Sequence, residues 1–225
     1  MTQDESKQAV AHRAAALVED GMAVGLGTGT TATMFIHALG ARVRSGLNIR
    51  CVASSDASHN LAASLGMNVL TLAELPQLDL YIDGADEVGP QLALIKGGGG
   101  ALLREKIVAS ASRRFAVVAD STKLVPTLGH FPLPVEVIKM ALPLVQRQLA
   151  ALGLKPSLRT QPDGNPYLTD EQNYILTCAC NTIPDPERTA AQIRAIVGVV
   201  EHGLFLHMAT SALVAGDSGV RELYP

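Results

Sequence analysis

Short apolar runs alternate with amphipathic stretches through the first half of the chain. Apolar runs bounded by glycine or polar residues are typical of buried strands, and apolar residues three or four positions apart are typical of helices. The pattern predicts helices at 2–20, 30–43, 56–66 and 100–112 and strands at 22–27, 49–54, 68–72, 78–88 and 114–120. Strands that alternate with helices favour an α/β fold, in which helices cover both faces of a parallel sheet.

Two of these helices have recognisable starts. Thr2 and Glu5 have the spacing of a capping box, and Gly21 is expected to end this first helix. The helix at 56–66 begins with Ser55 or Asp56, either of which is a favoured N-cap residue. These local signals support the helical assignment of both stretches.

The pattern changes near Pro132 and Pro134, whose rings restrict the backbone and indicate a joint. Beyond them we expect a helix at about 140–152, a polar turn at 161–166, a strand at 173–179, a helix at about 186–197, a strand around 197–205 and an apolar strand at 209–216 that returns to the first sheet. This order is typical of a small α+β unit. We therefore expect one domain made of residues 1–131 and 206–225 and a small domain made of residues 132–205.

Composition and charge narrow the class of protein. Hydrophobic residues make up 48% of the 225 residues, which is enough for a sizeable core, and the net charge of -3 gives no basic footprint for nucleic acid. The polar, acidic start of the chain does not match a signal peptide, and no apolar run is long enough to span a membrane. We therefore expect a cytoplasmic protein without nucleic-acid or membrane partners.

The three cysteines, Cys51, Cys178 and Cys180, are too few for a disulfide framework. The spacing of the last two does not match a zinc knuckle or a redox pair. We expect them to be buried and to pack as small apolar side chains.

Four polar segments follow predicted strands, and the carboxyl ends of parallel strands form the edge at which open sheets bind ligands. The first segment has alternating glycines and threonines before a helix, namely Gly25, Gly27, Thr28, Gly29, Thr30 and Thr31. Glycines let a backbone approach a ligand closely, and the N–H groups of a helix start suit a phosphate. The segment departs from the dinucleotide fingerprint and from the Walker A loop, and a tight turn without a ligand would have the same pattern.

The second and third segments are 54–58 and 83–88. The serines of the second fit either a helix cap or contact with a polyhydroxyl ligand. The third contains Asp83, Asp86 and Glu87, and carboxylates this close repel one another, so some need partners or raised pKa values. A solvated acidic turn would give the same pattern, and the segment lacks both a nearby histidine and the spacing of a calcium loop.

The fourth segment joins Lys96 to four glycines and a helix. Glu105 lies on this helix with apolar residues three and four positions away, which favours a partly desolvated carboxylate suited to proton abstraction. Arg104 and Lys106 have similar neighbours, so periodicity alone does not single out Glu105. Two further cations are expected at the same edge of the sheet: Lys123, after the strand at 114–120, and Lys7, on the first helix.

Five stretches of the chain together resemble the type A ribose-5-phosphate isomerase family: GLGTGTTA, SSDAS, DGADEV, KGGGGALLREKIVA and FPLPVEV. The resemblance covers essentially the whole chain. It implies interconversion of D-ribose 5-phosphate and D-ribulose 5-phosphate without a metal or organic cofactor. It also implies a Rossmann-like domain with a small ferredoxin-like domain, and assembly into homodimers or homotetramers.

Position by position, the resemblance implies that Glu105 is the general base, that Lys96 is the catalytic lysine and that Asp83 and Asp86 act on the substrate. The expected substrate-binding residues are Thr28, Gly29, Thr30, Thr31, Asp83, Gly84, Ala85, Asp86, Lys96, Gly97, Gly98, Gly99, Lys123 and Lys7. The family often has serine in place of Thr30, and both side chains carry a hydroxyl.

Three other functions need features that the sequence lacks. A metal-assisted hydride shift needs clustered carboxylates and histidines, whereas the six histidines are scattered along the sequence. A sugar-phosphate sensing module usually carries a DNA-binding segment, and we see no room for one before residue 21. A nicotinamide dehydrogenase needs an acidic residue about 20 positions after the glycine turn, and Asp56 comes too late for this role.

Overall fold

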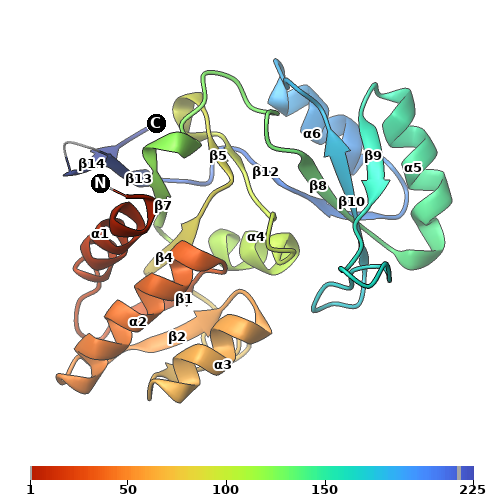
Figure 1. The fold of residues 1–225 in the computed structure, drawn as a ribbon. Helices are drawn as coiled ribbons and strands as arrows, with labels where there is room; N and C mark the ends of the chain where they lie inside the picture. The colour runs from red at the N-terminus through yellow and green to blue at the C-terminus, as the bar shows by residue number, and fades with distance from the viewer. Residues whose placement is uncertain (1, 217–218) are drawn as a thin grey trace. The chain divides into compact units, whose positions relative to one another are not determined.

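The structure, a computed structural model, describes residues 2–216 and 219–225, which fall into two units (Figure 1). The first unit spans Met1–Ala85, Arg104–Leu124 and His207–Pro225, and the second spans Asp86–Leu103 and Val125–Leu206. Each unit is therefore assembled from more than one stretch of the chain.

The first unit is built on a seven-stranded sheet. Across the sheet the strands are β14 (Gly219–Leu223), β13 (Ser211–Gly216), β7 (Phe115–Asp120), β4 (Leu80–Gly84), β1 (Ala23–Leu26), β2 (Arg50–Ala53) and β3 (Asn68–Val69). All neighbouring pairs are parallel except β13 and β14. Every residue of β1 and β7 is buried, which explains why β1 and residues 115–119 of β7 are continuous apolar runs.

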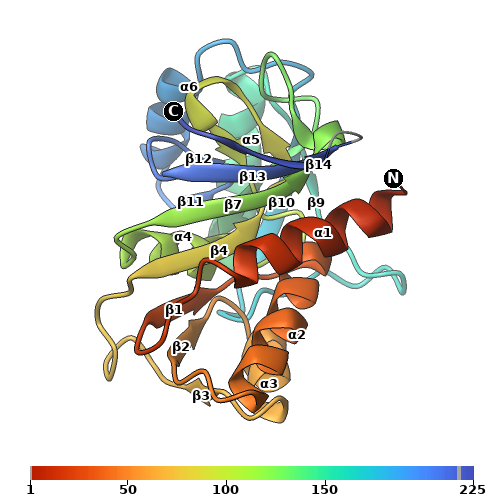
Figure 2. The same cartoon turned by 90° about the vertical axis from the view of Figure 1, so that its left-hand side faces the viewer.

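Helices cover both faces of this sheet, as the sequence predicts. The helices α1 (Gln3–Ala15), α2 (Thr30–Arg44) and α3 (Asp56–Ser64) pack over one face and share a core with alternate strand positions such as Leu26 and Ile82 (Figure 2). The helix α4 (Leu102–Ser110) covers the opposite face. A Cβ atom placed on Gly25 would lie 2.8 Å from Cγ1 of Val108 on this helix.

The predicted helix starts are confirmed, but α1 is shorter than predicted. Thr2 and Glu5 form the capping box, and the side chain of Ser55 caps α3. The helix α1 ends at Ala15 instead of continuing toward Gly21. The guanidinium of Arg42 on α2 donates to the carbonyls of Ala15 and Val18, so a side chain from another helix satisfies the end of α1.

The second unit contains a four-stranded antiparallel sheet with two helices. Its elements in chain order are β8 (Leu133–Val137), α5 (Leu142–Ala151), β9 (Lys155–Leu158), β10 (Tyr174–Ala179), α6 (Pro186–Arg194) and β11 (Val199–His202). The strands lie in the order β11-β8-β10-β9, and both helices pack in one core with alternate strand residues such as Val135 and Leu176. This order and strand arrangement define a ferredoxin-like unit, so the predicted fold class is confirmed.

A three-stranded sheet of β12 (Leu204–Phe205), β6 (Leu94–Ile95) and β5 (Glu87–Val88) completes the second unit. The predicted strand at 78–88 is therefore two strands in two sheets, because β4 ends before β5 begins. The division into units also differs from the boundaries drawn from the sequence, which place residues 86–103 and 125–131 in the larger domain. Pro134 lies inside β8 and so marks no joint.

Cys51 and Cys178 are buried as predicted, whereas Cys180, which follows the end of β10, is only half-buried. Burial raises the pKa of the Cys51 and Cys178 thiols to about 12. In residues 2–216 and 219–225, none of the helices combines the length and the hydropathy that a membrane span requires.

Candidate active site

The glycine turn after β1 is shaped by the side chains of the neighbouring strand β4. The register places Gly25 beside Tyr81, so Gly27 lies next to Asp83 on the same face of the sheet. A Cβ atom would lie 2.7 Å from Cδ2 of Tyr81 if placed on Gly25, and 2.6 Å from Cα of Asp83 if placed on Gly27. The sequence predicts that these two glycines let the backbone approach a ligand, whereas in the structure they make room for Tyr81 and Asp83.

Asp83 is held in one orientation by three hydrogen-bond donors. Its Oδ1 accepts from the backbone N–H groups of Thr28 (2.9 Å) and Gly84 (2.7 Å), and its Oδ2 accepts from the hydroxyl of Tyr81. The side chain is fully buried. A buried carboxylate with these partners is a fixed, preorganised group at the end of β4.

Tyr81 links Asp83 electrostatically to Glu105 on α4. Burial raises the pKa of the Tyr81 phenol well above its ordinary value, and the nearby negative charges of Asp83 and Glu105 raise it further. The phenol therefore stays protonated and remains a donor to Asp83. Within the first unit, Tyr81 and Asp83 are therefore in direct contact, and the charge of Glu105 acts on the Tyr81 phenol.

Glu105 is distinguished from its neighbours on α4 by its surroundings. It is 3% exposed, and it lies one turn before Val108, which packs beside Gly25 of β1. Arg104 instead forms an ion pair with Asp56 at 2.6 Å. Lys106 is also buried, so burial alone does not select Glu105, and its electrostatic effect on Tyr81 is the distinguishing observation.

The serine segment after β2 fixes the glycine turn. The hydroxyl of Thr28 forms hydrogen bonds with Ser54 (2.8 Å) and Ser55 (2.9 Å), and Ser58 donates to the carbonyl of Gly27 at 2.7 Å. Of the two interpretations of residues 54–58, the cap is confirmed. These hydroxyls also hold the turn against α3, which engages the Thr28 side chain within the protein.

The start of α2 has the geometry of an anion site. Gly29 is its N-cap with a φ of 105°, a left-handed conformation that favours glycine, and no side chain caps the helix. Thr30 is exposed and Thr31 is half-buried, and the first turn contains no acidic residue. The N–H groups and positive dipole end of α2 are therefore available to an anion.

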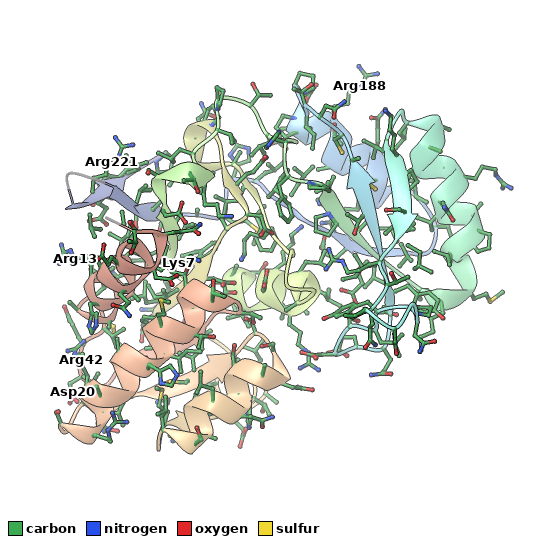
Figure 3. All side chains as sticks on the ribbon, viewed as in Figure 1. Lys7, Arg13, Asp20, Arg42, Arg188 and Arg221 are labelled. Carbon is green, nitrogen blue, oxygen red and sulfur yellow. The ribbon has the colours of Figure 1, made fainter. Side chains whose placement is uncertain are left out.

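Lys7 lies on α1, and Lys123 ends a short 3-10 helix (Ser121–Lys123) that follows β7. Figure 3 labels Lys7 on α1, and this helix packs against β7. The side chain of Gln3 on α1 donates a hydrogen bond of 3.4 Å to Asp120, the last residue of β7. Lys7 lies one turn after Gln3 on the same face of α1. Partial burial acts to raise the pKa of Asp120, but hydrogen bonds from Thr122 and Gln3 lower it overall, and the charge of Lys123, which follows Asp120, contributes a little in the same direction.

The remaining predicted carboxylates lie in the second unit, and backbone N–H groups bind both. Oδ2 of Asp86 accepts from the N–H of Gly98 at 2.7 Å, and Glu87 accepts from the N–H groups of Gly129 and Phe131. Glu87 is 2% exposed, so its role is to fix the segment that contains Gly129 and Phe131. The prediction that the crowded carboxylates have partners is confirmed.

Lys96 and the glycine loop Gly97–Gly100 follow β6 in the same unit. Lys96 is 2% exposed; its backbone N–H donates to the carbonyl of Gly203 at 2.9 Å, and its Nζ lies 5.4 Å from the ring centroid of Phe205. Gly97 and Gly100 have φ values of 98° and 94°, so both positions require glycine. The four glycines therefore form a defined turn.

Two residues that contact this loop were missed by the sequence analysis. Arg159 follows β9, and Tyr167 lies in the connection to β10. Both donate hydrogen bonds to carbonyls of the loop. No sequence motif marks either residue, because their importance arises from a contact across about sixty positions of the chain.

Among residues 2–216 and 219–225, no three His, Cys, Asp or Glu side chains are grouped as a metal site. The family model described as ribose 5-phosphate isomerase A (phosphoriboisomerase A) matches residues 50–219. The chain belongs to the ribose 5-phosphate isomerase A family. Its members are isomerases, and the chain is an enzyme of this class.

Similar proteins match the chain over nearly its whole length. A ribose-5-phosphate isomerase A from Parvibaculum lavamentivorans is 48% identical over 225 residues, which cover 97% of each chain. The solved ribose 5-phosphate isomerase A of Methanocaldococcus jannaschii is 39% identical with a TM-score of 0.95, and each chain is covered completely. A D-ribose-5-phosphate isomerase solved in complex with phospho-erythronic acid is 35% identical with a TM-score of 0.97, again over all of each chain.

Proposed function

We propose that this chain interconverts D-ribose 5-phosphate and D-ribulose 5-phosphate by proton transfer through an enediolate. The observation that carries the proposal is the buried group of Asp83, Tyr81 and Glu105 beside a glycine turn, in a chain of this isomerase family. The relative solved with phospho-erythronic acid supports it, because a phosphorylated sugar acid has both a phosphate and a planar anionic end. An enediolate of a sugar phosphate has the same two features.

Glu105 is the proposed general base. In the open-chain sugar it removes the proton from C2 of the aldose and returns it to C1, and the reverse reaction uses the same steps. A carboxylate that is 3% exposed has little competing water, so proton transfer can be confined to the substrate.

Lys96 and the two aspartates are proposed to handle the charges on oxygen. Lys96 supplies a positive charge to the enediolate oxygens, where negative charge develops. Asp83 is proposed to assist ring opening and proton movement between O1 and O2, with Asp86 as a second participant. Its fixed orientation supports this role, since an acid–base group must be aligned with the oxygen that it serves.

The phosphate is proposed to bind at the start of α2, with Lys7 and Lys123 as additional cations. Gly29, Thr30 and Thr31 offer N–H groups and hydroxyls there. The phosphate takes no part in the chemistry, and its binding aligns the sugar for reaction at the other end. We further propose that Gly84, Ala85 and the Gly97–Gly99 backbone contact the sugar, that the enzyme works in the cytoplasm as a homodimer or homotetramer, and that it needs no metal or organic cofactor.

The purified chain is expected to convert D-ribose 5-phosphate to D-ribulose 5-phosphate in a direct or coupled assay. In deuterium oxide the product is expected to gain solvent deuterium at C1, because a proton carried by a carboxylate exchanges with water. Exhaustive chelation is expected to leave the rate unchanged. Lack of turnover would contradict the proposed reaction, and turnover without deuterium gain that is lost on chelation would indicate a metal-assisted hydride shift.

Replacing Tyr81 by phenylalanine is expected to lower kcat about tenfold with little change in KM, because Asp83 loses one donor to its charged form. The aromatic ring remains beside Phe115, whose centroid lies 4.8 Å away, and it still fills the space next to Gly25. Steady-state kinetics and the unfolding temperature, measured together, separate an effect on Asp83 from a loss of packing. An unchanged kcat would show that the hydroxyl does not position Asp83 for the reaction.

A further inference from the structure

We propose that Arg159 and Tyr167 are positioning residues, which hold the glycine loop Gly97–Gly100 so that it presents the Gly99 N–H to the substrate. The inference rests on the proposed function, because it assigns how that loop binds the sugar phosphate. Neither residue belongs to the motifs that indicate the family.

Three of the four loop carbonyls accept hydrogen bonds from these two side chains. Nη1 of Arg159 donates to the carbonyls of Gly97 (3.3 Å) and Gly98 (3.1 Å), and the hydroxyl of Tyr167 donates to the carbonyl of Gly99 (3.3 Å). Three successive carbonyl groups are therefore bound by two side chains. A glycine segment has more backbone freedom than any other, so such contacts restrict it strongly.

The direction of the carbonyls fixes the direction of the N–H groups. In a trans peptide the C=O and the following N–H point in opposite directions. The N–H of Gly98, opposite the bound carbonyl of Gly97, donates to Asp86, and the N–H of Gly100 donates to the carbonyl of Gly97. The N–H of Gly99 points away from Arg159 and has no hydrogen-bond partner within the described part of the chain, so it is available to an oxygen of a ligand.

Charge explains why this arrangement suits an anionic substrate. A free glycine loop samples conformations that expose carbonyl oxygens, and these repel phosphate and enediolate oxygens. With the carbonyls bound and the Gly98 N–H engaged by Asp86, the exposed Gly99 presents its backbone N–H, which attracts an anion. The guanidinium also contributes a positive charge beside the loop, and it is half-buried.

The two side chains are themselves held in place. The guanidinium carbon of Arg159 lies 5.8 Å from the ring centroid of Tyr167, and the backbone N–H of Tyr167 donates to the carbonyl of Arg159 at 2.9 Å. A Cβ atom on Gly100 would lie 2.6 Å from Cζ of Tyr167, so glycine at this position allows the ring to approach. The pair forms one rigid group against the loop.

A buried carboxylate ties this group to the four-stranded sheet. Glu136, on the inner strand β8, is 1% exposed and accepts from the Thr169 hydroxyl (2.9 Å) and the Asn173 amide (3.0 Å). These residues follow Tyr167 in the chain and anchor its segment. Burial raises the pKa of Glu136, and the two hydrogen bonds act in the opposite direction. The loop conformation therefore depends on the second unit's own sheet.

Amide hydrogen exchange of residues 96–103 in the free protein tests the contact without any assumption about activity. Arg159→Met and Tyr167→Phe are each expected to speed exchange in this segment about tenfold, because each removes hydrogen bonds to the loop. Arg159→Lys keeps the positive charge but lacks the planar guanidinium, and it should give a smaller increase in the exchange rate. Arg188→Met is the matched control, since Arg188 is exposed on α6 of the same unit (Figure 3).

Kinetics with D-ribose 5-phosphate then test the positioning role. Arg159→Met is expected to raise KM about tenfold with a much smaller change in kcat, because the loop binds the sugar while Glu105 carries out the proton transfer. Unchanged exchange in both variants would overturn the proposal, and so would faster exchange with unchanged KM. If the unaltered chain does not isomerise the sugar, the proposed function fails. The amide exchange of residues 96–103 in the variants still decides whether Arg159 and Tyr167 hold the loop.

Discussion

Replacing Glu105 by glutamine is expected to lower kcat about a thousandfold and to abolish exchange of the substrate C2 proton with solvent. The amide has nearly the same shape as the carboxylate, so packing between α4 and the sheet is preserved. It cannot accept a proton, however, and the carbon acid of a sugar is too weak to ionise without a base. Steady-state kinetics and a proton-exchange measurement by nuclear magnetic resonance would record both effects.

The control for this variant is Glu19→Gln. Glu19 is exposed in the same unit, so its replacement changes the net charge equally and is expected to leave kcat unchanged. The unfolding temperature of both variants should be compared with that of the unaltered chain. If Glu105→Gln retained substantial activity with normal C2 exchange, the base would have to be another group.

Replacing Gly27 by alanine is expected to lower kcat about a hundredfold, because misplacing a catalytic group by about 1 Å has effects of this size. The added methyl group would lie 2.6 Å from the Cα atom of Asp83, which is backbone and cannot rotate away. Either β1 and β4 separate or the Asp83 carboxylate loses its hydrogen bonds. Overpacking of this kind is also expected to cost about 1–3 kcal/mol of unfolding free energy.

Gly216→Ala is the matched control for Gly27→Ala. Gly216 ends a strand of the same sheet, and the atoms nearest to an added Cβ there lie 3.7 Å away on Ser121, an ordinary contact distance. This substitution should leave the activity unchanged and slightly increase stability by restricting the unfolded chain. Equal activity of Gly27→Ala and Gly216→Ala would show that the space at Gly27 is not needed to hold Asp83.

The sequence predicts well those elements whose cause is local. The capping box of Thr2 and Glu5 and the N-cap of Ser55 are confirmed because each depends on residues within one helical turn. The end of α1 is missed because it depends on Arg42, which reaches it from another helix. The short strands β5 and β6 are likewise defined by their partners and not by their own composition.

In the candidate site, too, the sequence predicts the residues that have a local signal and misses those that depend on distant contacts. The motifs identify Asp83, Lys96 and Glu105 as candidates, because their chemistry and their positions after strands are visible in the sequence. The reason for glycine at 27 requires the register of β1 against β4, which no local pattern contains. Arg159 lies farther still along the chain from the loop that it binds.

The segments of the second unit lie between segments of the first along the chain, and this order has a consequence for biosynthesis. The strand β13 pairs with β7 and contacts α1, so α1 is synthesised long before a strand that it packs against. All residues of the second unit, which ends at Leu206, have emerged before β13 begins at Ser211. Until then the buried, apolar β7 has an open edge, which is a typical site of aggregation. Translation therefore starts the first unit before the second but completes the second unit before the first.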